Sequence, residues 1–181
     1  MNGAQSGSPQ HLRLLRPAQP ALRGIVMIDG VLFDHQVLEI MLKATRRYSP
    51  LEAGGLLLGF RKGRHLHVIE ATTPYAWDSQ SRVSFIRSPK AHRMRALRLW
   101  KESHKRVDWL GEWHSHPGFS PNPSGIDNRN WKQLVRHHKA PMVFPICNGR
   151  TTAIWLQQSV RFRPIRFEST HQDANGQLFA S

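Results

Sequence analysis

The spacing of apolar positions along the chain switches between a period of two residues and a period near 3.6, which predicts strands interleaved with helices. Short apolar or alternating runs predict strands at 25–28, 54–60, 65–71, 83–86, 107–116, 141–147, 151–156 and 160–167. Helices are predicted after three cap residues: from Asp34 to about Tyr48, from Ser88 with Pro89 at the first position, and from Ser124 to about His138. The pattern predicts one mixed α/β (α+β) domain.

Composition at the two ends of the chain sets the expected domain boundaries. Residues 1–22 are rich in Gly, Ser, Pro and Gln and show little periodicity, which predicts a disordered N-terminal arm. The segment 169–181 looks similar and is predicted to be a flexible tail, so the folded domain is expected at 23–168.

Charge and cysteine content narrow the class of protein. The chain of 181 residues has 26 Lys and Arg against 12 Asp and Glu, a net charge of +14. No apolar run approaches the ~18 residues of a membrane span, and the N-terminus lacks the apolar segment of a secretory signal, so we expect a bacterial cytoplasmic protein without a membrane partner. The one cysteine, Cys147, excludes an internal disulfide and a Cys-rich zinc module.

The second predicted helix combines an apolar stripe with basic residues. Its stripe at helical spacing consists of Ala91, Met94, Leu97 and Trp100. Lysines and arginines surround this stripe and continue elsewhere along the chain. We expect a solvated basic surface that suits an acidic protein partner, while a nucleic-acid partner is disfavoured because no motif supports it.

Two histidines and an aspartate form a candidate metal site. His114 and His116 stand at i and i+2 of a predicted strand, so both imidazoles project from one face. Asp127 falls in the first turn of the helix that follows, where it can point back toward the strand end. Two imidazoles and one carboxylate leave a fourth tetrahedral position open, as in catalytic zinc sites. A second pair, His65 and His67, lacks a nearby acidic or hydroxyl partner and is a weaker candidate.

Hydrolysis at such a site also needs a base and a group that stabilises the oxyanion. Ser124 can donate to an oxyanion, although Ser124-x-x-Asp127 is also the pattern of a helix capping box. Two glutamates compete for the role of base. Glu112 lies on the same strand face as His114, and Glu52 directly precedes a buried strand, so the spacing alone leaves both open.

Residues 49–131 resemble the JAMM/MPN (JAB) metallopeptidase family. Its signature is an upstream Glu followed by Gly-Gly, then His-Ser/Thr-His-Pro, then Ser-x-x-Asp, with seven residues between the second His and the Ser. The chain matches this signature with Glu52 in E-A-G-G, His114-Ser115-His116-Pro117 and Ser124-Gly-Ile-Asp127. In its segment G-E-W-H-S-H-P and its small size, the chain is most similar to bacterial JAB deconjugases of CBASS anti-phage operons.

The resemblance implies a JAB-type domain with a mixed sheet flanked by helices in a cytidine-deaminase-like arrangement. It implies one Zn²⁺ per chain held by His114, His116 and Asp127, with Glu52 as general base and Ser124 as oxyanion stabiliser. Glu112 would then have a supporting role.

The implied activity is that of a zinc isopeptidase acting on a ubiquitin-like or conjugated protein with an extended C-terminal tail. In a CBASS setting it would release a nucleotidyltransferase from its targets. Alternatives are a JAB peptidase acting on a phage-tail peptide, a cell-wall peptide or a ubiquitin-like precursor, and a non-catalytic basic binding module.

Overall fold

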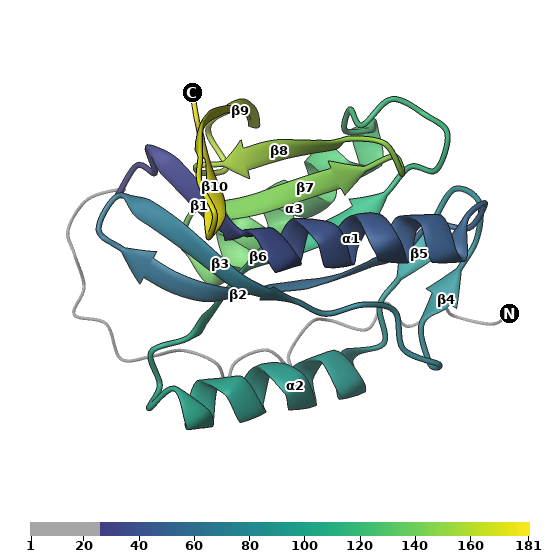
Figure 1. Ribbon diagram of the computed structural model, residues 1–181, viewed down its shortest axis with the longest axis horizontal. Helices are drawn as coiled ribbons and strands as arrows, with labels where there is room; N and C mark the ends of the chain where they lie inside the picture. Colours follow the sequence, from purple (N-terminus) through teal and green to yellow (C-terminus); the bar gives the residue numbers. More distant parts are fainter. Residues whose placement is uncertain (1–25) are drawn as a thin grey trace, which may run out of the picture.

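The computed structural model describes residues 26–181, and the predicted arm at 1–22 lies outside them (Figure 1). Three helices are present in this part of the chain, α1 (His35–Tyr48), α2 (Pro89–Glu102) and α3 (Gly125–His138). The strands are β1 (Gly30–Asp34), β2 (Gly54–Lys62), β3 (His65–Ala71), β4 (Ser79–Gln80), β5 (Phe85–Ile86), β6 (Asp108–Ser115), β7 (Met142–Cys147), β8 (Thr152–Gln157), β9 (Ile165–Gln172) and β10 (Gly176–Ala180). The predicted single α/β domain is thereby confirmed.

Eight of the strands form one closed sheet in the order β1-β10-β9-β8-β7-β6-β2-β3. Most neighbours are antiparallel, and the pairs β1–β3 and β6–β7 are parallel. The prediction was a mixed sheet flanked by helices, and it did not include closure. The sheet closes because β1 pairs on one edge with β3 and on the other with β10. The predicted cytidine-deaminase-like arrangement stays a prediction.

Helices cover both faces of the sheet (Figure 1). The apolar side of α1, with Val37, Leu38 and Met41, packs into a core with the inward side chains of β1, β2 and β3. A second core joins the outer side of β2, β6 and β7 to Ala96 of α2 and Trp131 of α3. The sheet is therefore buried on both faces around β6, the strand that carries His114 and ends just before His116.

The C-terminal residues form two strands, so the predicted flexible tail at 169–181 is wrong. β10 runs beside β1, with Gly30 opposite Ala180, and β9 joins β10 to β8. Phe179 is buried and packs edge-on against Phe33 at 5.7 Å between ring centroids. The pattern was misleading because Phe167 is the one buried position of β9, so this strand lacks the usual apolar alternation.

The N-terminal strand begins later than predicted. Of the segment 25–28, the described part 26–28 is not a strand, and β1 starts at Gly30. The main chain of Ile28 bonds instead to the side-chain amide of Gln158, at 2.9 Å for its N–H and 2.7 Å for its carbonyl. A side chain distant in sequence thus takes the place of a neighbouring strand.

The apolar stripe predicted for α2 is only partly correct. Met94 is largely exposed, while His92 and Ala96 are the buried residues of this helix. The helix therefore presents His92 to the barrel together with apolar residues, namely Ala96, Leu97 and Leu99. None of the helices in residues 26–181 has the length and apolar character that crossing a membrane requires.

Candidate metal centre

The structure brings His114, His116 and Asp127 together at one end of β6. His114 is the next-to-last residue of β6 and pairs with Gly54 of β2. His116 follows the strand, and its N–H donates to the carbonyl of Cys147 at 2.8 Å. The Nε2 atoms of the two histidines are 3.0 Å apart. Asp127 approaches from α3, with Oδ1 at 3.2 Å from Nε2 of His114 and Oδ2 at 3.7 Å from Nε2 of His116.

These three donors fit a tetrahedral zinc ion. Zinc–nitrogen and zinc–oxygen bonds of about 2.0–2.1 Å place neighbouring ligand atoms of a tetrahedron about 3.3 Å apart. The observed separations of 3.0, 3.2 and 3.7 Å scatter around that value. No other such group of His, Cys, Asp or Glu donors occurs within residues 26–181. The donor set also matches what zinc binds in catalytic sites, with three protein ligands.

Asp127 is held in place by a reciprocal capping box with Ser124. The N–H of Ser124 donates to Oδ2 of Asp127 at 2.6 Å, and the N–H of Asp127 donates to Oγ of Ser124 at 3.2 Å. Burial alone would raise the pKa of Asp127, but hydrogen bonds from His114 and Ser124 lower it well below its usual range. Asp127 thus belongs both to the capping box of α3 and to the candidate metal site, and the hydroxyl proton of Ser124 stays free to donate.

The histidines are suited to bind a cation as neutral rings. Burial lowers the pKa of His116, and the neighbouring His114 lowers it further. Nδ1 of His116 faces the carbonyl of Ser120 at 3.4 Å, which favours a proton on Nδ1. The lone pair of Nε2 is then directed at the candidate metal centre.

Glu52 lies beside this centre in a buried position. Its side chain precedes β2, and the residue is 9% exposed. Burial raises the pKa of its carboxyl to about 7, with His114 lowering it in part and Asp127 raising it. A carboxyl with a pKa near neutrality can both accept and return a proton at physiological pH.

Main-chain bonds fix the segment around Glu52. Its N–H donates to the carbonyl of Ser81 at 2.7 Å, and the amide of Gln80 donates to its carbonyl at 2.8 Å. The next residue, Ala53, exchanges bonds of 2.8 Å with the N–H and hydroxyl of Ser115, which stands between the two histidines. The roles of Gln80 and Ser115 could not be predicted from the sequence, since hydrogen bonds to the main chain leave no spacing signal.

The two glycines after Ala53 allow close packing at this point. A Cβ on Gly55 would lie 2.0 Å from the carbonyl oxygen of Thr72. A Cβ on Gly54 would lie 2.4 Å from the ring of Phe85 and 2.7 Å from the carbonyl oxygen of Trp113. The E-A-G-G segment therefore needs glycine for close approach of neighbouring chain segments.

The rival residues are occupied elsewhere. The carboxylate of Glu112 accepts a bond from Arg87 at 2.6 Å. In the second histidine pair, Nε2 of His67 lies 2.7 Å from Oδ1 of Asp34, and His65 is exposed. Cys147 is buried and its thiol pKa is raised by burial to about 12, which does not suit a nucleophile.

Comparison with known proteins identifies the family. Residues 34–165 match the model of "Prokaryotic homologs of the JAB domain". The chain is 48% identical over 110 residues to a CD-NTase/cGAS isopeptidase of Pseudomonas aeruginosa, covering 60% of this chain and 70% of that protein. It is 29% identical over 144 residues to a protein of the same name from Escherichia coli, covering 76% and 89%.

Two further matches are informative. A probable metalloprotease of Sinorhizobium fredii is 27% identical over 147 residues, covering 76% of this chain and 89% of that protein. A solution structure from Desulfitobacterium hafniense superposes with a TM-score of 0.57 at 22% identity, covering 74% and 87%, and shows a common fold. The predicted resemblance and the predicted enzyme class, a JAB-type metallopeptidase, are confirmed. The chain belongs to the prokaryotic JAB domain family.

Proposed function

We propose that the protein is a zinc-dependent isopeptidase that hydrolyses the bond between the C-terminus of one protein and an amine of another. The observation that carries this proposal is the convergence of His114, His116 and Asp127, whose donor atoms are spaced like the corners of a zinc tetrahedron. A zinc ion bound there would supply a Lewis acid that polarises a carbonyl and lowers the pKa of water.

Glu52 is proposed as the residue that moves the proton. Its carboxylate accepts a proton from the attacking water, and the resulting carboxyl returns it to the amine nitrogen as the C–N bond breaks. The pKa of about 7 suits both halves of this transfer. Glu112 is poorly placed for the role because its carboxylate is paired with Arg87.

Ser124 is proposed to stabilise the developing oxyanion. Its Oγ accepts the N–H of Asp127, so the hydroxyl proton is left to donate toward the scissile carbonyl oxygen. Because Ser124 is also the N-cap of α3, its side chain is oriented before the substrate arrives.

The substrate is proposed to be a conjugate formed by a CD-NTase-type nucleotidyltransferase, attached through its extended C-terminal tail. The names of the relatives from Pseudomonas aeruginosa and Escherichia coli support this choice. Exposed apolar residues adjoin the site residues in the sequence, with Phe119 between His116 and Ser124, Ile126 next to Asp127, and Leu51 next to Glu52. Exposed apolar side chains of this kind suit contact with an extended peptide. We place this reaction in the bacterial cytoplasm.

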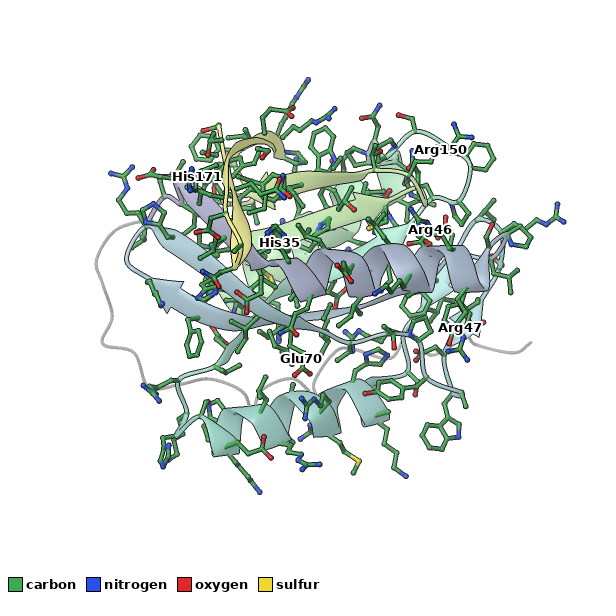
Figure 2. All side chains as sticks on the ribbon, in the orientation of Figure 1. His35, Arg46, Arg47, Glu70, Arg150 and His171 are labelled. Atoms are coloured by element: carbon green, nitrogen blue, oxygen red, sulfur yellow. The ribbon has the colours of Figure 1, made fainter. Side chains whose placement is uncertain are left out.

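An acidic surface is proposed for the partner protein. Arg46, Arg47 and Arg150 lie at the same end of the molecule (Figure 2). A cavity of about 220 Å³ is lined by Arg46, Pro117 and Gly149 among others, and Pro117 directly follows His116 in the chain. Nε of Arg46 donates to the carbonyl of Gly149 at 2.8 Å, which positions its guanidinium group. These charges would attract an acidic segment near the scissile bond.

The test uses a purified conjugate of a CD-NTase-type nucleotidyltransferase, and gel or mass-spectrometric detection of cleavage. We expect cleavage to stop on chelation and to return with Zn²⁺. The E52Q variant should keep one zinc per chain yet lose at least 10³-fold in kcat, in line with loss of a general base. The E112Q variant serves as the matched control and should retain activity. A protein that binds zinc fully but cleaves no conjugate would contradict the proposal.

A further inference from the structure

Thr72, His92 and Asp78 form a chain of hydrogen bonds between the barrel and α2. Oγ1 of Thr72 lies 2.7 Å from Nδ1 of His92, and Nε2 of His92 lies 2.9 Å from Oδ2 of Asp78. The side chains of His92 and Asp78 are fully buried. Because buried polar groups are costly without partners, this chain is a specific feature of the structure.

The neighbours of Thr72 and Asp78 fix the direction of these bonds. The carboxylate of Asp78 can only accept, so Nε2 of His92 carries the ring proton and Nδ1 accepts the hydroxyl proton of Thr72, whose Oγ1 in turn accepts the N–H of Leu56 at 2.7 Å. Burial lowers the pKa of His92, in agreement with a neutral ring. Asp78 therefore accepts one bond from His92, and its carboxylate also accepts the N–H groups of Tyr75 and Ser88, each at 2.7 Å.

Asp78 closes the base of the short β4–β5 hairpin. It directly precedes β4, and its bond to the N–H of Ser88 reaches the chain just beyond β5. The hairpin in turn lies against the Glu52 segment, since the carbonyl of Ser81 and the amide of Gln80 hold both main-chain groups of Glu52.

Thr72 connects the same chain of bonds to the strand of the histidine ligands. Its carbonyl accepts the indole N–H of Trp113 at 2.8 Å, and Trp113 directly precedes His114. The hydroxyl of Thr72 holds Leu56, which follows the glycines of the E-A-G-G segment. The chain of hydrogen bonds that starts at His92 of α2 therefore reaches both the segment of Glu52 and the strand of His114.

We propose that Asp78, His92 and Thr72 are positioning residues, which hold the hairpin and β2 so that the Glu52 carboxylate faces the reacting groups. This inference rests on the proposed function. A merely structural role would be to attach α2 to the barrel, but α2 has a second anchor in the ion pair of Arg95 with Glu70, which is labelled between β3 and α2 in Figure 2. The chain of bonds can therefore be broken without releasing the helix.

The experiment compares D78N and T72V with T72S, which restores the hydroxyl, and with D108N as a matched control. Asp108 is also a buried carboxylate, bonded to Arg61 at 2.8 Å, but it lies six residues before His114 on β6, about 20 Å away. Each variant is loaded with zinc and assayed for bound metal, thermal midpoint, kcat and KM on the conjugate. Amide hydrogen exchange is followed by mass spectrometry in peptides covering 50–56 and 79–88.

We expect D78N and T72V to lose at least tenfold in kcat, with KM within threefold of the wild type and one zinc per chain. Exchange at 50–56 and 79–88 should become faster in both. T72S should stay within threefold in kcat, and D108N should lower the thermal midpoint while kcat stays within threefold and exchange at 50–56 is unchanged.

Two results would overturn the inference: unchanged exchange at 50–56 in D78N and T72V, or faster exchange with kcat within threefold of the wild type. A different result separates the two proposals. If the wild type cleaves no conjugate, the proposed function fails, and the exchange data alone decide whether this chain of bonds holds the Glu52 segment.

Discussion

The carbonyl oxygen of Thr72 lies 2.0 Å from the point that a Cβ on Gly55 would occupy. No rotamer change can relieve this overlap, because the obstacle is main chain rather than a flexible side chain. The second glycine of E-A-G-G is thus needed for the packing of β2 against the residue that follows β3, next to the candidate site.

The G55A variant is accordingly expected to lose about 3 kcal/mol in the free energy of unfolding, the upper range of overpacking in a core. Chemical denaturation of the zinc-free protein measures this loss. The control is G125A, because a Cβ on Gly125 at the start of α3 meets nothing closer than 3.6 Å. That variant should be neutral or more stable by up to about 1 kcal/mol. Equal stability of both variants would contradict the argument.

Zinc should stabilise the folded chain through His114, His116 and Asp127. At a free zinc concentration one hundred times Kd, binding adds about 2.7 kcal/mol, which corresponds to a rise of about 5–10 °C in the thermal midpoint of a domain this size. Differential scanning fluorimetry with and without chelator measures the shift. H114A and D127N should abolish it, whereas H65A, in the second histidine pair, should retain it. A full shift in H114A would place the metal elsewhere.

Ser124 should contribute to both stability and turnover. In S124A, α3 loses its N-cap, which costs about 1 kcal/mol in the free energy of unfolding. The loss of an oxyanion donor should lower kcat by about 10²–10³-fold. S124N offers a control, since asparagine is an equally good N-cap. If S124N restores stability without restoring kcat, the two roles are separate, whereas full activity of S124A would show that the hydroxyl acts only as a cap.

The buried Glu52 carboxyl should make the metal-free protein less stable as the pH rises. In the unfolded chain it ionises near 4.5, but in the folded chain it keeps its proton up to about pH 7. Between these values the folded state binds more protons, so the free energy of unfolding falls with rising pH. Each pKa unit corresponds to about 1.4 kcal/mol, and partial solvent access reduces the total to about 2 kcal/mol.

The E52Q variant cannot ionise at this position and should lack that fall. Denaturant titrations in chelator should show E52Q more stable than the wild type at pH 8 by about 2 kcal/mol, with nearly equal stabilities at pH 4. A wild type that gains stability over E52Q as the pH rises would mean that Glu52 ionises more easily in the folded chain than in the unfolded one.

The linear sequence was sufficient for the elements that carry strong local signals. Caps at Asp34, Ser88 and Ser124 located the starts of all three helices of residues 26–181. The spacing of His114, His116 and Asp127 pointed to a shared site because a strand and the first turn of a helix fix where such side chains project. These predictions depend on neighbours within about a dozen residues, and local geometry determines them.

Other features were decided only by tertiary structure. β10 closes the barrel against β1, although the segment looked like a tail, because its pairing partner lies about 150 residues away. The spacing left Glu52 and Glu112 open as candidate bases, and only the fold shows that Arg87, from the segment before α2, pairs with Glu112 while burial raises the pKa of Glu52. The sequence carried no signal for His92, which is fully buried and hydrogen-bonded to Thr72 and Asp78. A sequence lists donors and acceptors, but which of them meet depends on contacts between distant segments, and those exist only once the sheet has closed.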